Sequence, residues 1–293
     1  MKQEGACVFV VTPIYNRVSH TIEFIESLKE SSYKNLRIVI VDDGSTDNSV
    51  AIISNRFPEV SLLKTKGNLW WSGATNVGVE YALKNKADFI FTVNNDVILD
   101  KNSIAKLVEE AKVHPRTLIG SIIRDIDNRN YVWYFGGFFN KDIGDLSHVT
   151  GSVNDFKGAR ASEWLTGMGV LIPVEVFNKI GLYDAKNFPQ YHGDADFSLR
   201  AKKAGFKLIV SSKSVIFADL DSSWLGKEIL DKSLSFIPAA LFSTKSQFNI
   251  IIRCKFYWRH WKIRYLARFY KHFFSSLVKP LIKHKLKKLL GRQ

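Results

Sequence analysis

Before His114 the chain alternates between short apolar runs and longer segments in which apolar residues recur at helical spacing. Short apolar runs are typical of buried strands, and their alternation with helices predicts a parallel sheet with helical crossovers. The expected strands are residues 8–11, 36–41, 60–63 and 89–93, and the expected helices are residues 21–30, 48–55, 74–84 and 103–113. Ligands of such sheets bind at the carboxyl ends of the strands, so a site is expected in the loops that follow them.

The pattern changes after Pro115. Residues 131–139 (YVWYFGGFF) are aromatic and interrupted by glycine, which is typical of a hairpin or a bulged strand. Further strands are expected at 164–172 and 207–217, with a helix over about 194–204 between them. The second half is therefore predicted to extend a mixed sheet, and the fold class to be α/β with helices flanking that sheet.

Basic residues concentrate at the end of the chain. The whole sequence has 42 Lys and Arg against 28 Asp and Glu, a net charge of +14. From Leu241 to Gln293 there are 14 basic residues and no acidic one, so the part before Leu241 is neutral. We therefore predict an α/β domain over residues 1–235 and a basic amphipathic helical tail over residues 236–293.

Within the tail, helical periodicity over residues 251–276 places aromatic side chains on one stripe, with cations such as Arg253 on its flanks. The stripe comprises Cys254, Trp258, Trp261, Tyr265 and Phe269. An aromatic stripe edged by cations is typical of a helix on an anionic membrane surface, and residues 281–290 (LIKHKLKKLL) add a second basic segment. Alternatively, the stripe packs on the α/β domain. A nucleic-acid partner is not expected, because the stripe geometry and the lack of a recognised fold argue against it.

Neither a secretion signal nor a membrane span is expected. The first apolar run is interrupted by Thr12-Pro13, and no stretch reaches the roughly 18 uncharged apolar residues of a spanning helix. The two cysteines, Cys7 and Cys254, lie far apart, which indicates reduced thiols. We expect a cytoplasmic protein that is peripheral on the cytoplasmic face of the membrane.

Two loops at the ends of expected strands combine carboxylates with small polar residues. Asp42 and Asp43 precede Gly44, and a carboxylate there can accept a hydrogen bond from a nucleobase or a ribose hydroxyl. Asn95 and Asp96 follow the fourth strand, and their oxygens suit Mg²⁺ or Mn²⁺. Such residues also form turns and helix caps, so each motif alone leaves this structural explanation open.

Several segments occur in an order and spacing that resemble the family 2 glycosyltransferases with the GT-A fold. They are VTPIYNR from Val11, VDDGSTDNS from Val41, GNLWWSGATNVGVEYAL from Gly67 and FTVNNDV from Phe91. Residues 164–182 resemble the acceptor-side strand and helix of that family, and YHGDADFSLRAKKAGF from Tyr191 resembles its acidic catalytic motif. The resemblance covers roughly residues 7–225. It favours bacterial cell-surface polysaccharide and rhamnosyltransferase-like members.

The resemblance implies a role for each matching residue. The implied donor nucleotide-binding residues are Pro13, Tyr15, Asp42, Asp43, Asn68, Asn76 and Asn95. Asp96 would ligate the divalent metal, Mg²⁺ or Mn²⁺, and Asp194 would be the catalytic base. Trp164 and Asp196 are candidates for the acceptor side. The structural alternative for Asp194 and Asp196 is that they cap the following helix. Trp164 and Trp71 could stack against a sugar ring, and the alternative for both is that they belong to the core.

Two positions depart from the family's pattern. Gly193 stands where many relatives carry a glutamate, so the acidic pair is a single Asp194 here. Many relatives also place a metal-binding histidine after the last core strand, where this chain has Asp219. Asp219 and His192 are the candidates to complete the metal site.

The mechanism that the resemblance implies is inverting transfer from a nucleoside diphosphate sugar. Asp194 would deprotonate an acceptor hydroxyl, and the metal would neutralise charge on the leaving diphosphate. The expected role is synthesis of a cell-surface polysaccharide or a lipid-linked glycan. The alternatives are transfer to a soluble or protein acceptor, and a non-catalytic sugar-nucleotide-binding or scaffold protein of the same fold.

Overall fold

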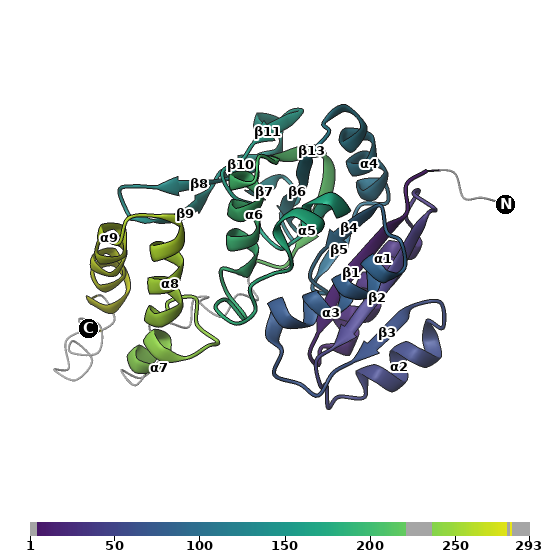
Figure 1. Cartoon of the computed structure of the whole chain (residues 1–293), viewed down its shortest axis with the longest axis horizontal. Coiled ribbons are helices and arrows are strands. Elements are labelled where there is room, and N and C mark those ends of the chain that lie inside the picture. The colour runs from purple at the N-terminus through teal and green to yellow at the C-terminus, as the bar shows by residue number, and fades with distance from the viewer. Residues whose placement is uncertain (1–4, 221–235, 280–281, 283–293) are drawn as a thin grey trace. The chain divides into compact units, whose positions relative to one another are not determined.

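In a computed structural model the protein is described over residues 5–220, 236–279 and 282 (Figure 1). These residues form two compact units. The first contains the chain up to Phe138 and from His148 to Asp219, and the second contains Phe139–Ser147 and the residues after Asp219. Apart from Ile282, the predicted basic segment 281–290 lies outside the described residues. None of the helices in the described ranges is long and apolar enough to cross a bilayer.

The first half of the first unit is a parallel sheet. Its strands β1 (Val8–Ile14), β2 (Leu36–Asp42), β3 (Ser61–Lys64) and β4 (Phe89–Thr92) lie in the order β3-β2-β1-β4. Helices α1 (Val18–Lys29), α2 (Ser49–Arg56) and α3 (Trp70–Lys84) connect them. β1 is buried along nearly its whole length, because apolar residues point to both of its faces. The strands and helices predicted before His114 are confirmed, with ends shifted by at most four residues.

The second half adds antiparallel and parallel strands to the same sheet. β12 (Val170–Pro173) pairs antiparallel with both β4 and β6 (Thr117–Asp125). β13 (Lys207–Ala218) runs parallel to β6, and its last residues pair antiparallel with β5 (Val97–Leu99). The other elements are α4 (Ser103–Val113), β7 (Tyr131–Tyr134), β10 (Gly151–Ser152), a 3-10 turn (Val153–Asp155), β11 (Ala159–Ala161), α5 (Val174–Ile180) and α6 (Gly193–Lys203). The predicted mixed sheet with flanking helices is confirmed.

The strand predicted over residues 164–172 begins only at Val170. Gly169 has a φ of 96°, in the left-handed region that favours glycine, so the chain turns before the strand starts. In the preceding loop, Gly167 packs so closely on Trp71 that a Cβ atom would lie 2.5 Å from the indole ring. The apolar pattern of this segment therefore reflects close packing of a loop as well as strand pairing.

The second unit combines most of a hairpin, Phe139–Ser147, with short helices. The hairpin strands are β8 (Gly137–Asn140) and β9 (Asp145–His148), and the helices are α7 (Phe236–Phe242), α8 (Ile250–His260), α9 (Arg264–Phe273) and a π-helical turn (Phe274–Val278). Phe139 stacks on Trp261 with ring centroids 4.4 Å apart, and the Tyr257 hydroxyl donates to the Gly144 carbonyl. Phe139–Ser147 thus belongs to the unit of the tail, although the sequence analysis placed it in the first domain.

The prediction of one continuous aromatic stripe over residues 251–276 is wrong. The helix ends at His260, and Trp261 has extended backbone angles (φ −136°, ψ 179°), so α8 and α9 divide the stripe. Trp258 is 82% exposed, whereas Phe269 is buried. The periodicity assumed an unbroken helix, but packing within the unit decides which side chains are covered.

A buried ion pair joins the hairpin to α8. Arg253, which was predicted to flank the stripe, is 3% exposed, and its guanidinium donates to both Asp145 carboxylate oxygens at 2.8 and 3.2 Å. The guanidinium also lies 3.6 Å from the ring centroid of Phe269. Burial lowers the pKa of Arg253, but the charge and hydrogen bonds of Asp145, together with Tyr257 and Tyr270, outweigh burial, so the net pKa is raised and the group stays charged.

Replacing Arg253 with methionine is expected to destabilise the second unit by about 3–5 kcal/mol, because it leaves the Asp145 carboxylate without its partner. The measurement is the free energy of unfolding in urea, followed by tryptophan fluorescence. Lys255→Met is the control, since Lys255 is an exposed cation on the same helix. Equal stability of the two variants would show that this ion pair does not hold the unit together.

Candidate functional site

The carboxyl ends of the parallel strands meet at one edge of the sheet. Ile14 at the end of β1 is in register with Asp42 at the end of β2. The loops that follow are tied together, since the Asn16 N–H donates to the Ser45 hydroxyl at 2.7 Å and the Asn16 side-chain oxygen accepts from the Thr46 N–H at 2.8 Å. The residues predicted from separate motifs are therefore brought to a common, cross-linked edge.

The paired carboxylates at this edge differ in their surroundings. One Asp43 oxygen accepts from the Thr65 hydroxyl at 2.6 Å, and the other accepts from the Trp70 N–H at 2.9 Å. One Asp42 oxygen accepts from the Ser45 N–H at 3.2 Å, and its other oxygen is buried without a hydrogen-bond partner. Asp43 therefore holds the loop before α3, while Asp42 retains acceptor capacity.

The other predicted donor-binding residues fall into two groups. Pro13 lies in β1, Tyr15 at its end is 61% exposed, and Asn68 is exposed in the loop before α3 with a φ of 67°. Asn76 instead uses both amide atoms on the backbone of Tyr183, donating to its carbonyl at 2.8 Å and accepting from its N–H at 2.9 Å. This geometry argues against the donor-binding role predicted for Asn76.

The turn between β4 and β5 carries the predicted metal ligand. One Asp96 oxygen accepts from the Arg17 guanidinium at 2.9 Å, and the other is buried without a hydrogen-bond partner. The Asn95 amide donates to the Thr21 hydroxyl at 2.8 Å and fixes the turn on α1. A buried carboxylate oxygen with no donor is a suitable ligand for a hard divalent cation.

Strand register brings a second carboxylate to the same place. Ala218 pairs with Val97 as the last pair of the antiparallel β13–β5 ladder, so Asp219 and Asp96 are the residues directly next to this pair. His192 is the N-cap residue of α6, with a φ of 66°. Over the residues that the structure describes, no three His, Cys, Asp or Glu side chains gather as a metal site. One or two carboxylates plus substrate phosphates are nevertheless a usual environment for Mg²⁺.

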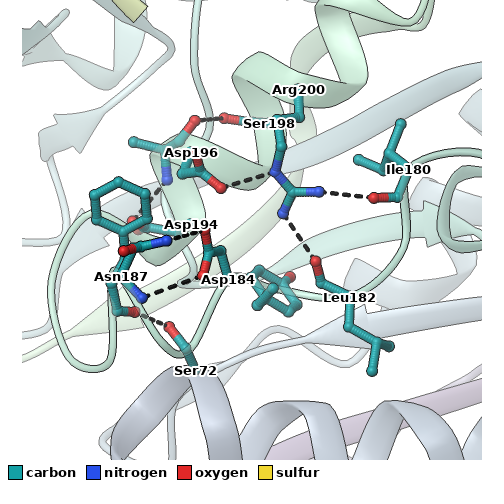
Figure 2. Close-up of polar contacts among 12 residues, drawn as sticks. Ser72, Ile180, Leu182, Asp184, Asn187, Asp194, Asp196, Ser198 and Arg200 are labelled. Carbon is teal, nitrogen blue, oxygen red and sulfur yellow. Dashed lines mark hydrogen bonds and ion pairs between the residues drawn. The ribbon is translucent and has the colours of Figure 1, made fainter. Parts of the chain in front are cut away.

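Asp194 lies in the first turn of α6 (Figure 2). One carboxylate oxygen accepts from the Gly167 N–H and the other from the Ala195 N–H, both at 2.8 Å. Burial raises the pKa of Asp194 and outweighs these N–H donors, which lower it. The group lines a small cavity with Thr92 and Tyr183, among others. A carboxylate that is held in one orientation with a raised pKa is well suited to accept a proton.

Asp196 has a structural environment. It is fully buried, and the Arg200 guanidinium donates to it at 2.8 Å. Figure 2 shows that the same guanidinium also donates to the carbonyls of Ile180 and Leu182, at 2.9 and 2.8 Å. Asp196 thus helps to fix α6 on the end of α5 and the residues that follow it, which argues against the acceptor-side role predicted for it.

Trp164 also lies in the core. It is 9% exposed, its ring is 5.7 Å from that of Tyr134, and its indole N–H donates to the Phe138 carbonyl at 3.3 Å. A Cβ atom on Gly137 would lie 2.3 Å from the indole, so the glycine allows this close packing. The contacts favour the core explanation of Trp164 over an acceptor contact.

Trp71 connects the metal-side turn with Asp194. Its indole N–H donates to the Asn94 side chain at 2.9 Å, and its ring lies edge-to-face against Tyr183 at 5.3 Å. The ring also packs on Gly167, whose N–H holds Asp194. Trp71 thus contacts both the turn that carries Asp96 and the loop whose Gly167 N–H holds Asp194.

Arg17 is a site residue for which the sequence pattern predicted no role. Its position directly after the first strand, within VTPIYNR, was the available signal. The ion pair with Asp96 could not be foreseen, because it depends on how the turns after β1 and β4 approach each other.

A family model described as Glycosyl transferase family 2 matches residues 9–180. The chain belongs to this family. The family 2 glycosyltransferase described here is 27% identical over 243 residues to the glycosyltransferase GlyG of Streptococcus pneumoniae serotype 4, covering 78% of this chain and 79% of that protein. It is 26% identical over 218 residues to the N-acetylglucosaminyl-diphospho-decaprenol L-rhamnosyltransferase of Mycobacterium tuberculosis, covering 67% of this chain and 71% of that protein.

The same fold occurs in a solved glycosyltransferase structure. The crystal structure of GalNAc-T7 with UDP, GalNAc and Mn²⁺ matches with a TM-score of 0.59 at 15% identity, covering 94% of this chain and 59% of that one. At this identity the likeness is one of fold alone. The predicted GT-A fold, the family and the glycosyltransferase activity class are confirmed.

Proposed function

We propose that this glycosyltransferase transfers a sugar from a nucleoside diphosphate sugar to an acceptor hydroxyl with inversion, and that Asp194 is the catalytic base. The observation that carries this proposal is the environment of Asp194, whose carboxylate is held by two backbone N–H groups and whose pKa is raised by burial. Trp71 links this carboxylate to the turn of Asp96, where the leaving group would be bound.

The proposed step is a single displacement. The ionised Asp194 accepts the proton of the acceptor hydroxyl, whose oxygen forms a bond to the anomeric carbon of the donor sugar. The bond from that carbon to the diphosphate oxygen breaks, and the nucleoside diphosphate leaves with the electron pair. Attack opposite to the leaving group inverts the anomeric configuration.

The donor nucleotide is proposed to lie at the edge formed by β1 and β2. The exposed Tyr15 ring and Pro13 offer a surface for the base. The unpaired Asp42 oxygen suits a base N–H or a ribose hydroxyl, while Asp43 supports the loop that carries Asn68. Asn95, which is bonded to Thr21, lies beside the ribose in this proposal.

A divalent cation, Mg²⁺ or Mn²⁺, fits the Asp96 turn, because Asp96 has a buried oxygen without a donor and Asp219 follows the last residue of β13 that pairs with β5. Such an ion, when bound, neutralises negative charge that develops on the leaving diphosphate. The UDP and Mn²⁺ of the GalNAc-T7 structure support this proposal.

The acceptor is proposed to be a glycan or a lipid-linked glycan in cell-surface polysaccharide synthesis. The name of the mycobacterial relative specifies a sugar on diphospho-decaprenol as its acceptor. The test is to incubate the purified protein with UDP- and dTDP-sugars and Mn²⁺, and to measure sugar transfer to polyprenyl-diphosphate-linked and to soluble acceptors. Transfer to soluble acceptors alone would contradict the lipid-linked acceptor. Donor binding without any turnover would support a scaffold protein instead.

The second unit is proposed to rest on the anionic cytoplasmic face of the membrane through α8. Ile251, Lys255 and Trp258 are exposed at positions i, i+4 and i+7 of this helix, and so share one face. No acidic residue follows Leu241 in the sequence. An exposed tryptophan beside cations is typical of an anchor at a membrane interface. We therefore assign membrane binding to this face of α8 and no longer to a stripe that runs over residues 251–276.

Exchanging Trp258 for serine and Lys255 for glutamate is expected to release the protein from vesicles that contain phosphatidylglycerol. A cation near an anionic surface contributes about 1 kcal/mol, so removing Lys255 alone weakens binding about fivefold. Flotation of full-length protein with these vesicles is the measurement. Lys84→Glu is the control, since it changes an exposed lysine of the first unit by the same charge. If Lys255→Glu and Lys84→Glu weaken vesicle binding equally, the total charge of the protein, and not the α8 face, is responsible for binding.

A further inference from the structure

The ion pair between Arg17 and Asp96 lies at the proposed metal position. The Arg17 guanidinium donates to one Asp96 oxygen at 2.9 Å, and the Arg17 side chain is 50% exposed. The second Asp96 oxygen is buried without a hydrogen-bond partner. Arg17 thus pairs with one Asp96 oxygen and leaves the other without a donor. A divalent cation bound by Asp96 would compete with Arg17 for this carboxylate.

The backbone holds Arg17 in this place. Asn16 and Arg17 have φ values of 58° and 60°, a left-handed conformation that costs energy for residues other than glycine. The Arg17 carbonyl accepts from the Thr21 hydroxyl at 3.1 Å, and that hydroxyl accepts from Asn95, the neighbour of Asp96. The two turns are therefore coupled, which keeps the Arg17 backbone beside the turn of Asp96.

We propose that Arg17 is an exchangeable counter-ion, which pairs with Asp96 while the donor site is empty and with the donor diphosphate once the cation is bound. This inference rests on the proposed donor site. A half-exposed ion pair is weak and opens readily. A guanidinium, in contrast, binds phosphate oxygens through two parallel N–H bonds that are stronger than neutral ones.

The proposal requires opposite effects of one substitution. Arg17→Gln removes the competitor of the cation, so Mn²⁺ alone is expected to bind about 2- to 5-fold more tightly. The same variant loses a charged contact to the diphosphate, so UDP and dTDP at saturating Mn²⁺ are expected to bind about tenfold or more weakly. Damage to the fold would weaken both equilibria, and it would not produce opposite signs.

Calorimetry on the full-length protein tests this, with MnCl₂ alone and then with UDP or dTDP at saturating Mn²⁺. Arg56→Gln is the matched control, because Arg56 forms an exposed ion pair with Glu26 away from the site. Arg17→Lys should retain part of the diphosphate affinity, since it keeps the charge but lacks the planar fork.

The outcomes separate this inference from the function on which it rests. Opposite shifts in Arg17→Gln, with none in Arg56→Gln, support the exchange. If the wild-type protein binds Mn²⁺ and the nucleotides but Arg17→Gln weakens both or changes neither, the exchange is overturned while the donor site stands. If the wild-type protein binds neither Mn²⁺ nor any nucleotide, the proposed donor site itself is overturned, and the exchange with it.

Discussion

Replacing Asp194 with asparagine is expected to lower sugar transfer by about 10²–10⁴-fold, the usual contribution of an aligned general base. Asparagine cannot accept the proton of the acceptor hydroxyl. It also presents an NH₂ group to one of the two backbone N–H groups, of Gly167 or Ala195, that the carboxylate now binds. Nucleotide affinity should remain nearly unchanged, because the residues proposed to bind the base lie in other loops. The measurements are initial transfer rates and calorimetry with UDP or dTDP.

Asp184→Asn is the control for lost packing. Asp184 accepts from both the backbone N–H and the side-chain amide of Asn187, so this variant also loses a hydrogen bond to a carboxylate, in the loop before α6 (Figure 2). Transfer should survive in this variant. An equal loss of transfer in both variants would mean that local structure, and not a base, is responsible for the Asp194 effect.

The pH dependence of transfer offers a second check on Asp194. Burial raises the pKa of Asp194 above its ordinary value of 3.8. The base acts only when ionised, so kcat/KM should fall as the pH drops through this raised pKa, earlier than for an exposed aspartate. The same desolvation favours the protonated folded state, so this group's contribution to stability decreases as pH rises through its folded pKa. Both trends should be absent from Asp194→Asn.

The parallel half of the fold could be predicted because local signals and tertiary structure agree there. The runs that became β1 and β2 are buried on both faces, so their apolar composition and their environment coincide. Once these strands are placed, parallel pairing brings Asp42 and Tyr15 to one edge without further information. The donor-side residues were therefore accessible from sequence pattern and family resemblance together.

Side-chain roles that depend on distant partners could not be read from the chain. Asn76 binds the backbone of Tyr183, and Asp196 is buried against Arg200. Both residues lie within motifs that suggest ligand binding. Only the three-dimensional contacts show that their side chains instead hold other parts of the fold in place. The hairpin in the tail unit is a similar case, because the Arg253–Asp145 pair joins segments 108 residues apart.

Replacing Asp96 with alanine is expected to abolish the contribution of metal to nucleotide binding. The buried Asp96 oxygen without a donor is the proposed ligand atom, and Asp219 by itself would leave the cation with a single carboxylate. The affinity for UDP or dTDP should then be the same in Mn²⁺ as in EDTA. The substitution also frees Arg17 from its ion pair, so the affinity measured in EDTA should not fall below that of the wild-type protein.

Calorimetry with and without Mn²⁺ gives both quantities, and two further variants make the result specific. Asp88→Ala removes a carboxylate just before β4, at the opposite edge of the sheet, and should keep the metal dependence of the wild-type protein. Asp219→Asn should reduce that dependence without removing it, because Asp219 follows the last pair of the β13–β5 ladder and is exposed there. Metal-dependent affinity that survives in Asp96→Ala and disappears in Asp219→Asn would move the cation to the end of β13. In that case the Asp96 oxygen without a partner would need a hydrogen-bond donor from the substrate instead of a cation.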